Sequence, residues 1–278
     1  MKTRLRRLFR LGRLALHLAL GALVVKLVYP LCKRDTRLAL RAYWCRRMLR
    51  VLGVELHLDG TIPPGCHLIA ANHVSWLDVV AIGAILPCWY VSKAEISAWP
   101  LAGWMAAANE TLFLRRASAR AVYRMNSEIR ARLRLQQSVV VFPEGTTTDG
   151  AHVLDFYPAL FQPAVDLARP VLPLAISYRD HAARPAPAVA YINDDPLWLS
   201  LRAVLDAPRT EAHLTLDNVL APPAYKRREL AMHACDAIRR MRRRHLEAAP
   251  LAARAAPVVM QQLDAANLIA PFSSDRYN

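Results

Sequence analysis

The residues best suited to acid–base chemistry are His73 and Asp78, in the segment Asn72-His73-Val74-Ser75-Trp76-Leu77-Asp78. An imidazole can act as a base when a carboxylate holds one ring nitrogen and leaves the other free. On one continuous helix these two residues would lie about 140° apart. The segment instead leaves an apolar stretch and enters a helical one, and such a turn would let Asp78 fold back toward His73. The pair would then lie at the carboxyl end of a strand, where α/β sheets bind ligands.

The same spacing has a purely structural interpretation. Ser75 is a good helix N-cap, and Asp78, three residues later, completes a capping box. Asp78 would then only cap the helix, and His73 would only end the strand. The spacing alone leaves both interpretations open.

Two further segments carry groups that could bind oxygen-rich ligands. Residues 142–150 (Phe-Pro-Glu-Gly-Thr-Thr-Thr-Asp-Gly) follow a fully apolar stretch and offer N–H and O–H donors for phosphate or diol oxygens. A polar turn with a helix cap is the alternative. Arg115 and Arg116 end another apolar stretch and could clamp a phosphate. Arg120 and Arg124 continue the helical spacing of Arg116, and for these two we favour a solvated or lipid-facing basic face.

These segments belong to a chain in which apolar strands alternate with helices. We expect strands at 54–58, 66–71, 88–92, 111–114, 138–142 and 171–177, with a further one at 188–192, and helices at 76–86 and 117–136. This alternation predicts an α/β domain with a mainly parallel, buried mixed sheet flanked by helices.

The first 50 residues differ from the rest, because they hold fourteen Lys and Arg against one acid, while the remainder holds 23 bases and 21 acids. An apolar stretch at 14–32 follows the basic residues. A signal peptide has this layout, but no small-residue cleavage site follows, and Leu31 before Cys32 is not the small residue of a lipoprotein signal. We therefore expect an uncleaved anchor that spans or dips into the membrane, with its basic end cytoplasmic.

A second helix is expected at 36–52, where apolar and arginine residues mix. It could lie in the membrane interface or be an ordinary surface helix of the globular domain. We divide the chain into a membrane-associated helical segment at 1–53, a catalytic domain at 54–249 and a loosely ordered tail at 250–278.

Composition narrows the classes of function. A nucleic-acid binder would carry its basic surface on the folded domain. Here the excess of positive charge lies beside apolar residues, which favours anionic lipid headgroups. The five cysteines form no CxxC and have no metal-ligand spacing with histidine, so we expect reduced, buried thiols, a body that faces the cytosol and no metal.

Taken together, the motifs resemble the lysophosphatidic acid acyltransferase family, the glycerolipid acyltransferases with an H-x4-D motif. His73-x4-Asp78 matches the first motif, and Phe-Pro-Glu-Gly-Thr at 142–146 matches the third. Arg116 matches the arginine that ends the second motif, and Pro173 matches the fourth. Order and spacing agree over residues 54–180, and the resemblance implies the glycerol-3-phosphate acyltransferase-like fold.

The chain departs from the family pattern in two places. The glycine that usually precedes the second motif is replaced by Asn109 or Glu110. After the third motif the family often has Phe-Lys-x-Gly, whereas this chain has Phe-Tyr-Pro-Ala at 156–159. The missing lysine points to a different acceptor headgroup, such as that of a lyso-ornithine lipid.

The resemblance implies that His73 takes the proton from the free hydroxyl of a lysolipid as that oxygen attacks an acyl thioester, while Asp78 orients the imidazole. Lysophosphatidate, which becomes phosphatidate, is the first candidate acceptor. The donor would be acyl-CoA or an acyl-carrier protein, and no resident cofactor is needed. Backbone N–H groups at 72–76 would hold the oxyanion. The substrate-binding residues would be Asn72, Ser75, Arg116, Glu144, Gly145, Thr146 and Pro173.

Within this set, residues 144–146 would position the glycerol portion of the acceptor, and Arg116 would bind its phosphate. The protein would work at the inner (cytoplasmic) membrane, with its catalytic domain facing the cytoplasm and membrane lipids as partners. Two alternatives remain open. A catalytically silent lipid-binding protein could keep the same fold, and a thioesterase would release acyl groups without any acceptor.

Overall fold

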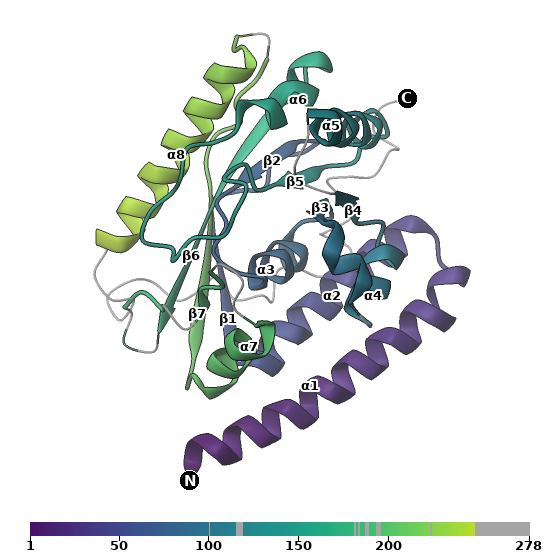
Figure 1. Ribbon diagram of the computed structural model, residues 1–278, viewed down its shortest axis with the longest axis vertical. Coiled ribbons are helices and arrows are strands. Elements are labelled where there is room, and N and C mark those ends of the chain that lie inside the picture. The colour runs from purple at the N-terminus through teal and green to yellow at the C-terminus, as the bar shows by residue number, and fades with distance from the viewer. Residues whose placement is uncertain are drawn as a thin grey trace.

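A computed structural model describes residues 1–99, 101–114, 119–180, 182, 184–186, 189–192, 196–222 and 224–247. Within these residues, one seven-stranded sheet is flanked by helices (Figure 1). The strands are β1 (Val54–Asp59), β2 (Leu68–Ala71), β3 (Trp89–Lys93), β4 (Leu112–Leu114), β5 (Val139–Val141), β6 (Val171–Asp180) and β7 (Thr210–Leu216).

Helices pack on both faces of the sheet. The α-helices are α1 (Lys2–Leu27), α2 (Arg34–Leu52), α3 (Leu77–Ile85), α4 (Ala102–Ala108), α5 (Ala119–Arg134), α6 (Gln162–Asp166), α7 (Leu197–Asp206) and α8 (Arg227–Glu247). Three short 3-10 helices are η1 (Tyr29–Leu31), η2 (Ala94–Ala98) and η3 (Pro158–Phe161) among the described residues.

The sheet is mixed, with the strand order β1-β7-β6-β2-β5-β3-β4. Every neighbouring pair is parallel except β6 and β7, so β1 and β7 run opposite to the other five strands. The predicted fold class, a mainly parallel mixed sheet flanked by helices, is confirmed.

The central strand β2 shows why this sheet is buried on both faces. Ile69 and Ala71 join the apolar cluster under α2, α3 and α7, whereas Leu68 and Ala70 join the cluster under α5, α6 and α8. All four side chains are at most 1% exposed. Apolar residues on both sides of a strand are the pattern of a parallel sheet covered by helices on each face.

The region after β6 differs most from the sequence-based expectation. A strand was expected at 188–192, of which residue 188 lies outside the described residues. Residues 189–192 form no strand, so that prediction is wrong. Tyr191 instead donates its N–H to the Val74 carbonyl at 3.0 Å and accepts a bond from Thr147, which ties the segment to two loops. The predictions also left α7, β7 and α8 unassigned.

Helix α1 is the candidate membrane segment. Among the described residues, one helical stretch, Lys2–Leu31, is long and apolar enough to cross a membrane by length and composition, a test that a buried core helix or a signal sequence would also pass. Only Leu14, Gly21 and Val25 of α1 are buried, while the helix exposes large apolar side chains: Leu5, Leu8, Phe9, Leu16, Leu20, Leu23 and Leu27. This apolar surface indicates an association with a membrane.

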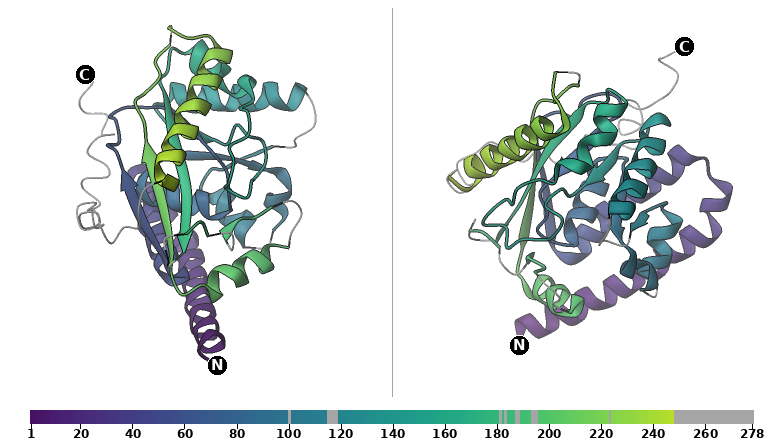
Figure 2. Two further views of the ribbon diagram at one scale, coloured as in Figure 1. Left: turned by 90° about the vertical axis from the view of Figure 1, so that its left-hand side faces the viewer. Right: turned by 45° about the horizontal axis from the view of Figure 1, so that its top comes forward.

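The same helix remains attached to the body at its basic end, where it runs beside α2 and α7 (Figures 1 and 2). Arg10 donates to the carbonyls of Leu205 and Ala207 at 3.1 and 2.7 Å, and Arg7 pairs with Asp206 at 2.6 Å. The carbonyls of Leu205 and Ala207 lie at the carboxyl end of α7, where backbone carbonyls lack helical partners and cations are favourable.

Helix α2 packs into the globular body. It contacts α3 and β1, and Leu49 and Leu52 are almost fully buried. Even Arg41 and Arg46 are below 10% exposed and donate to the carbonyls of Cys88 and Ala84. This burial fits a helix of the globular domain, the second of the two possibilities kept for this segment, better than a helix lying in the membrane interface.

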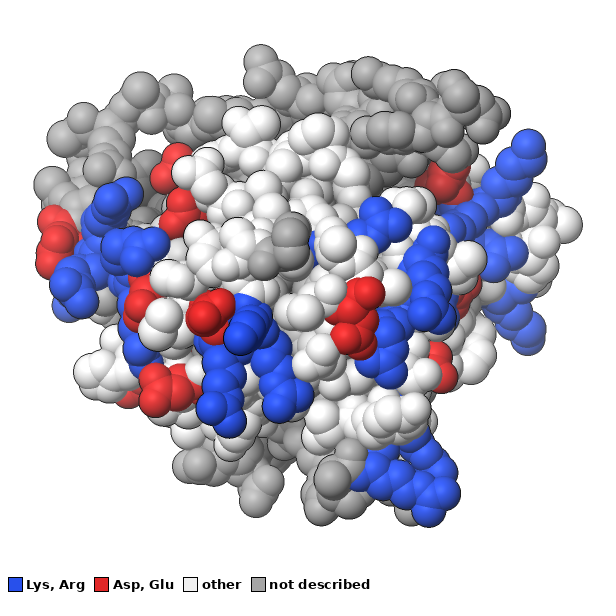
Figure 3. Space-filling model, turned by 90° about the horizontal axis from the view of Figure 1, so that it is seen from above, with Lys and Arg blue, Asp and Glu red and all other residues white. Residues whose placement is uncertain are grey.

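The outer surface seen in Figure 3 carries Lys and Arg side chains spread among Asp, Glu and uncharged residues. No uninterrupted basic patch covers the described part of this face.

Candidate active site

His73 and Asp78 are in direct contact. The turn after β2 carries His73, and the first turn of α3 carries Asp78, whose Oδ2 lies 2.7 Å from Nδ1 of the imidazole. The Asp78 side chain is fully buried, and that of His73 is 17% exposed. No described residue hydrogen-bonds to Nε2 of His73. The imidazole therefore has one nitrogen held by a carboxylate and the other available to a substrate.

The Asp78 carboxylate is held by four donors. Besides His73, the backbone N–H groups of Val74 and Ser75 donate to Oδ2 at 2.7 and 2.9 Å, and the Tyr178 hydroxyl donates to Oδ1 at 2.7 Å. Asp78 therefore does both things expected of it, because it bonds to the backbone N–H groups of the turn before α3 and also holds the His73 imidazole. Burial and the neighbouring Asp78 raise the pKa of Tyr178 well above its ordinary value, so this phenol remains a proton donor.

Glu144 holds His73 from the other side. Its Oε1 accepts the His73 backbone N–H at 2.7 Å, and its Oε2 accepts the Leu154 backbone N–H at 2.8 Å. The residue is 3% exposed. Burial raises the pKa of the Glu144 carboxyl, and the two backbone donors partly offset that rise. Both oxygens are thus committed within the protein.

The loop from 142 to 155 wraps around the imidazole. The Phe142 ring stacks on the His73 ring with centroids 4.0 Å apart, and the Thr148 N–H donates to the His73 carbonyl at 2.9 Å. Gly145 has φ +75°, a conformation that favours glycine, and a Cβ there would lie 2.8 Å from the Tyr157 ring. This loop therefore needs glycine at position 145 for both its conformation and its packing.

Helix α8 fastens the same loop from outside. Arg242 donates to the Gly150 carbonyl, and Arg239 donates to the Val153 carbonyl at 2.9 Å. Cys235 contacts the Leu154 carbonyl at 3.5 Å. Because Leu154 is also bonded to Glu144, α8 is linked through the loop to the backbone of His73.

The remaining predicted site residues lie in different surroundings. Asn72 and Ser75 are 0% exposed, and the Asn72 amide is paired with both backbone groups of Ile176 on β6, at 2.7 and 3.0 Å. Pro173 is buried in β6 opposite Ala70. Thr146 is exposed beside the site, and Arg116 lies outside the described residues.

Three of the expected oxyanion donors at 72–76 are already engaged within the protein. The backbone N–H groups of His73, Val74 and Ser75 already donate to the carboxylates of Glu144 and Asp78. In this arrangement they are not aimed at a substrate oxygen. These donors instead help to orient His73 and Asp78.

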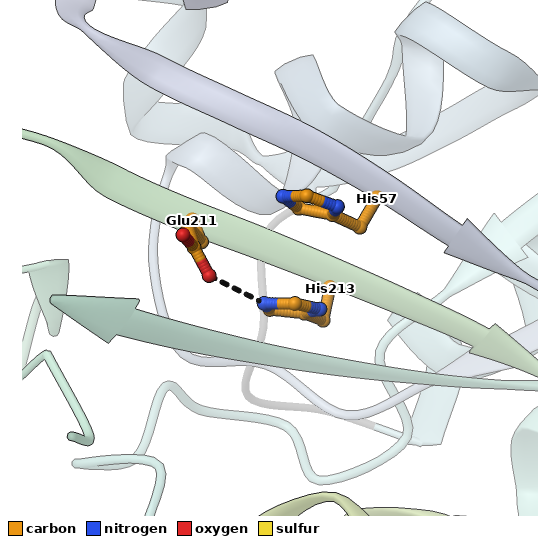
Figure 4. Close-up of side chains that lie close together, drawn as sticks. All are labelled: His57, Glu211 and His213. Carbon is orange, nitrogen blue, oxygen red and sulfur yellow. Dashed lines mark hydrogen bonds and ion pairs between the residues drawn. The ribbon is translucent and has the colours of Figure 1, made fainter. Parts of the chain in front are cut away.

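A separate cluster of titratable groups lies where β1 meets β7 (Figure 4). The rings of His57 and His213 stack 4.6 Å apart, and Glu211 lies 3.2 Å from His213. Burial, followed by His57 and Arg179, lowers the pKa of His213 to about 3.

These three side chains offer possible metal ligands within 4.8 Å of one another. The rings are nearly parallel, however, so their nitrogen lone pairs run side by side rather than converging on one point. Arg209 already pairs with Glu211 at 3.3 Å. We therefore assign the cluster to the packing of β1 on β7, and the absence of a metal stays a prediction.

Comparisons with known proteins place the chain among acyltransferases. A family model described as Acyltransferase matches residues 53–177. A lyso-ornithine lipid O-acyltransferase from Pseudomonas aeruginosa is 37% identical over 247 residues, which cover 85% of this chain and 93% of that protein. A 1-acyl-sn-glycerol-3-phosphate acyltransferase from Neisseria meningitidis is 38% identical over 141 residues, 50% of this chain and 55% of that protein.

The fold has a solved counterpart. The crystal structure of the 1-acyl-sn-glycerophosphate (LPA) acyltransferase from Thermotoga maritima matches with a TM-score of 0.64 at 20% identity, over 88% of this chain and 99% of that one. Fold and motifs together define an α/β lipid acyltransferase. The chain belongs to the acyltransferase family, as the resemblance of its motifs predicted.

Proposed function

We propose that this enzyme moves a fatty acyl group from an acyl thioester to the free hydroxyl of a lysolipid, with His73 as the general base. The observation that carries the proposal is the 2.7 Å contact between Nδ1 of His73 and the buried carboxylate of Asp78. That contact keeps Nδ1 protonated and leaves Nε2 to accept the hydroxyl proton.

The reaction then needs no covalent enzyme intermediate. As Nε2 takes the proton, the acceptor oxygen attacks the thioester carbonyl, and a tetrahedral adduct forms. Its collapse breaks the carbon–sulfur bond, and the imidazolium returns the proton to the leaving thiolate. Asp78 stabilises the imidazolium in between, and Tyr178 and two backbone donors keep the carboxylate in place. Acyl-CoA or an acyl-carrier protein would serve as donor.

The geometry supports a positioning role for the buried members of the predicted binding set. Glu144 links the 142–155 loop to the His73 backbone, and Asn72 links the same turn to β6. Thr146, Gly145 and Arg116 remain the candidates for direct contact with the acceptor.

Two acceptors are candidates. Lysophosphatidate is the one that the motifs imply, and the relative from N. meningitidis is named for it. Lyso-ornithine lipid is favoured by two observations. The relative named for it matches 85% of this chain, and the lysine that the family often carries after its third motif is missing at residues 156–159.

A direct comparison of acceptors tests the proposal. The purified enzyme would receive one acyl-CoA and either lysophosphatidate or lyso-ornithine lipid, with thiol release and product lipid measured together. The proposal predicts product with at least one acceptor, and the longer match favours lyso-ornithine lipid. Thiol release without any acceptor would indicate a thioesterase. If neither lipid causes thiol release, from acyl-CoA or from an acyl-carrier protein donor, the protein is a silent lipid-binding protein.

We further propose that α1 dips into the inner membrane while the catalytic body faces the cytoplasm. The helix exposes a row of large apolar side chains, and its basic end stays bonded to α7. A helix held along the body in this way can bury its free face in one leaflet without separating from the enzyme. Protease accessibility from each side of sealed membrane vesicles would test this orientation.

A further inference from the structure

A small cationic pocket lies at the amino-terminal ends of β3 and β4, whereas the catalytic pair lies at the carboxyl end of β2. Trp89 begins β3 and Glu110 precedes β4, whereas His73 follows the end of β2, and these strands are linked through parallel pairs. The pocket is a half-open hollow of about 70 Å³ between α2 and the α4–β4 connection. This is several times the roughly 10–15 Å³ that one water molecule needs.

Positive charge gathers around the indole of Trp89. The guanidinium of Arg34 lies 4.5 Å from the ring centroid, and those of Arg41 and Arg132 each lie 5.8 Å from it. Arg37 also lines the pocket. Three arginines therefore line the pocket against one carboxylate, that of Glu110, and the carboxylate of Asp35 also acts on Arg34.

That carboxylate is already committed. Glu110 accepts the Trp89 indole N–H at 3.1 Å and is paired with Arg132. Its backbone has φ +58°, in the left-handed region that glycine favours. These two bonds hold the Glu110 side chain, and among the described residues no ion pair joins Arg34, Arg37 or Arg41 to a carboxylate.

The buried arginine of the pocket has an unmet hydrogen-bonding group. Arg41 is 9% exposed, and its Nη2 donates to the Cys88 carbonyl at 2.5 Å. Its Nε is buried and finds no partner among the described residues. Burial lowers the pKa of Arg34, the carboxylates of Glu110 and Asp35 raise it, and the neighbouring Arg132 and Arg41 lower it. An anion in the pocket would give these guanidinium groups a further partner.

We propose that this pocket binds a phosphate group through Arg34, Arg37 and Arg41. Arginine forks match phosphate oxygens, and the face of the Trp89 ring lies against two of the three guanidinium groups, those of Arg34 and Arg41. The phosphate could come from an anionic phospholipid headgroup or from a soluble phosphate compound. The exposed apolar residues Val28 and Leu31 flank Tyr29 of the pocket wall, which places a lipid surface within reach.

The test uses the full chain in phosphatidylcholine nanodiscs, labelled with fluorotryptophan and assigned at Trp89 by Trp89→Phe. Inorganic phosphate is titrated to about 10 mM while the fluorine resonance of Trp89 is followed. The double variant Arg34→Gln/Arg37→Gln removes two pocket cations and leaves Arg41 in place, because Arg41 is part of the packing of α2. The matched control, Arg47→Gln/Arg50→Gln, removes two exposed cations from the same helix.

We expect phosphate to shift the Trp89 resonance in a saturable way, with affinity at least about tenfold weaker in the pocket variant and within about twofold of wild type in the control. Nanodiscs containing about 20% phosphatidylglycerol identify the source. If phosphate no longer shifts the Trp89 resonance in these nanodiscs, the lipid headgroup occupies the pocket. If phosphate still shifts it, a soluble phosphate compound is the ligand.

Three results would overturn the proposal. The Trp89 resonance could stay unmoved by both phosphate and phosphatidylglycerol. Equal weakening in the two double variants would reveal diffuse attraction to the basic helix instead of a pocket. A shift of the Trp89 resonance that does not saturate with phosphate would also indicate diffuse attraction. The readout does not involve acyl transfer, so its failure would leave the proposed function untouched.

Discussion

Replacing Glu144 with glutamine separates two roles that this residue could have. The change keeps the shape of the side chain, but it replaces one of two carboxylate oxygens with an NH2 group. In the structure both oxygens accept backbone N–H groups, from His73 at 2.7 Å and from Leu154 at 2.8 Å. Whichever way the amide turns, one N–H will face another donor.

The expected size of the effect follows from that lost contact. A hydrogen bond to a charged group contributes about 1.5–3 kcal/mol, and an unsatisfied buried donor costs a similar amount. If this free energy is used to hold His73 in register with Asp78, turnover should fall about tenfold to a hundredfold. Burial already disfavours the ionised carboxylate, so the free energy of unfolding should change less than the activity does.

The assay follows thiol release from acyl-CoA over a range of acceptor concentrations. A positioning role lowers kcat and leaves the acceptor KM near its wild-type value. Glu128→Gln, an exposed residue on α5, is the matched control and should behave as wild type. A raised acceptor KM with normal kcat would refute the reasoning, because it would mean that Glu144 contacts the acceptor directly.

Three other changes test the shell around the catalytic pair. Tyr178→Phe removes one donor from Asp78 and keeps the buried ring, so we expect kcat to fall about tenfold with little change in KM, and wild-type turnover would contradict this. Arg242→Gln should lower kcat by loosening the loop at Gly150, whereas Arg243→Gln, its exposed neighbour on α8, should not, and equal effects would dismiss the link. Because the pKa of Glu144 is raised in the folded protein, its proton stabilises the fold below the unfolded pKa, and this contribution is lost as pH rises through the folded value. In urea unfolding at several pH values, the free energy of unfolding of wild type should therefore rise relative to that of Glu144→Gln as the pH falls. A rise in this difference at higher pH instead would contradict the assigned sign.

The local part of the site was predictable from the sequence. His73 and Asp78 lie in one short turn, so their spacing carries information on its own. The strand pattern was equally readable, because buried parallel strands are short apolar runs. The expected strands at 54–58 and 138–142 became β1 and β5 within one residue at each end.

The distant part of the site was not predictable. Tyr178 lies 100 residues after Asp78, and only the pairing of β6 with β2 brings its strand to the catalytic turn. Arg239 and Arg242 stand in an arginine-rich helix that reads as an ordinary basic surface, and no local signal marks the two that face the loop. Tertiary contacts across the chain decide these roles.

The role expected for Glu144 shows a different limit. The motif marks the residue as important, but it does not say whether the carboxylate faces the substrate or the protein. The structure places both oxygens on backbone donors, at 3% exposure of the residue. Burial, which a single sequence does not display for a polar residue, separates the two possibilities.

The central claim is that the His73 imidazole deprotonates the acceptor hydroxyl. The most direct measurement is the rate of acyl transfer by His73→Ala, with the folded state checked by its thermal unfolding curve. We predict a loss of about a hundredfold to ten-thousandfold in kcat in a variant that still unfolds in one cooperative transition. A folded His73→Ala enzyme whose kcat lies within about twofold of wild type would contradict the account.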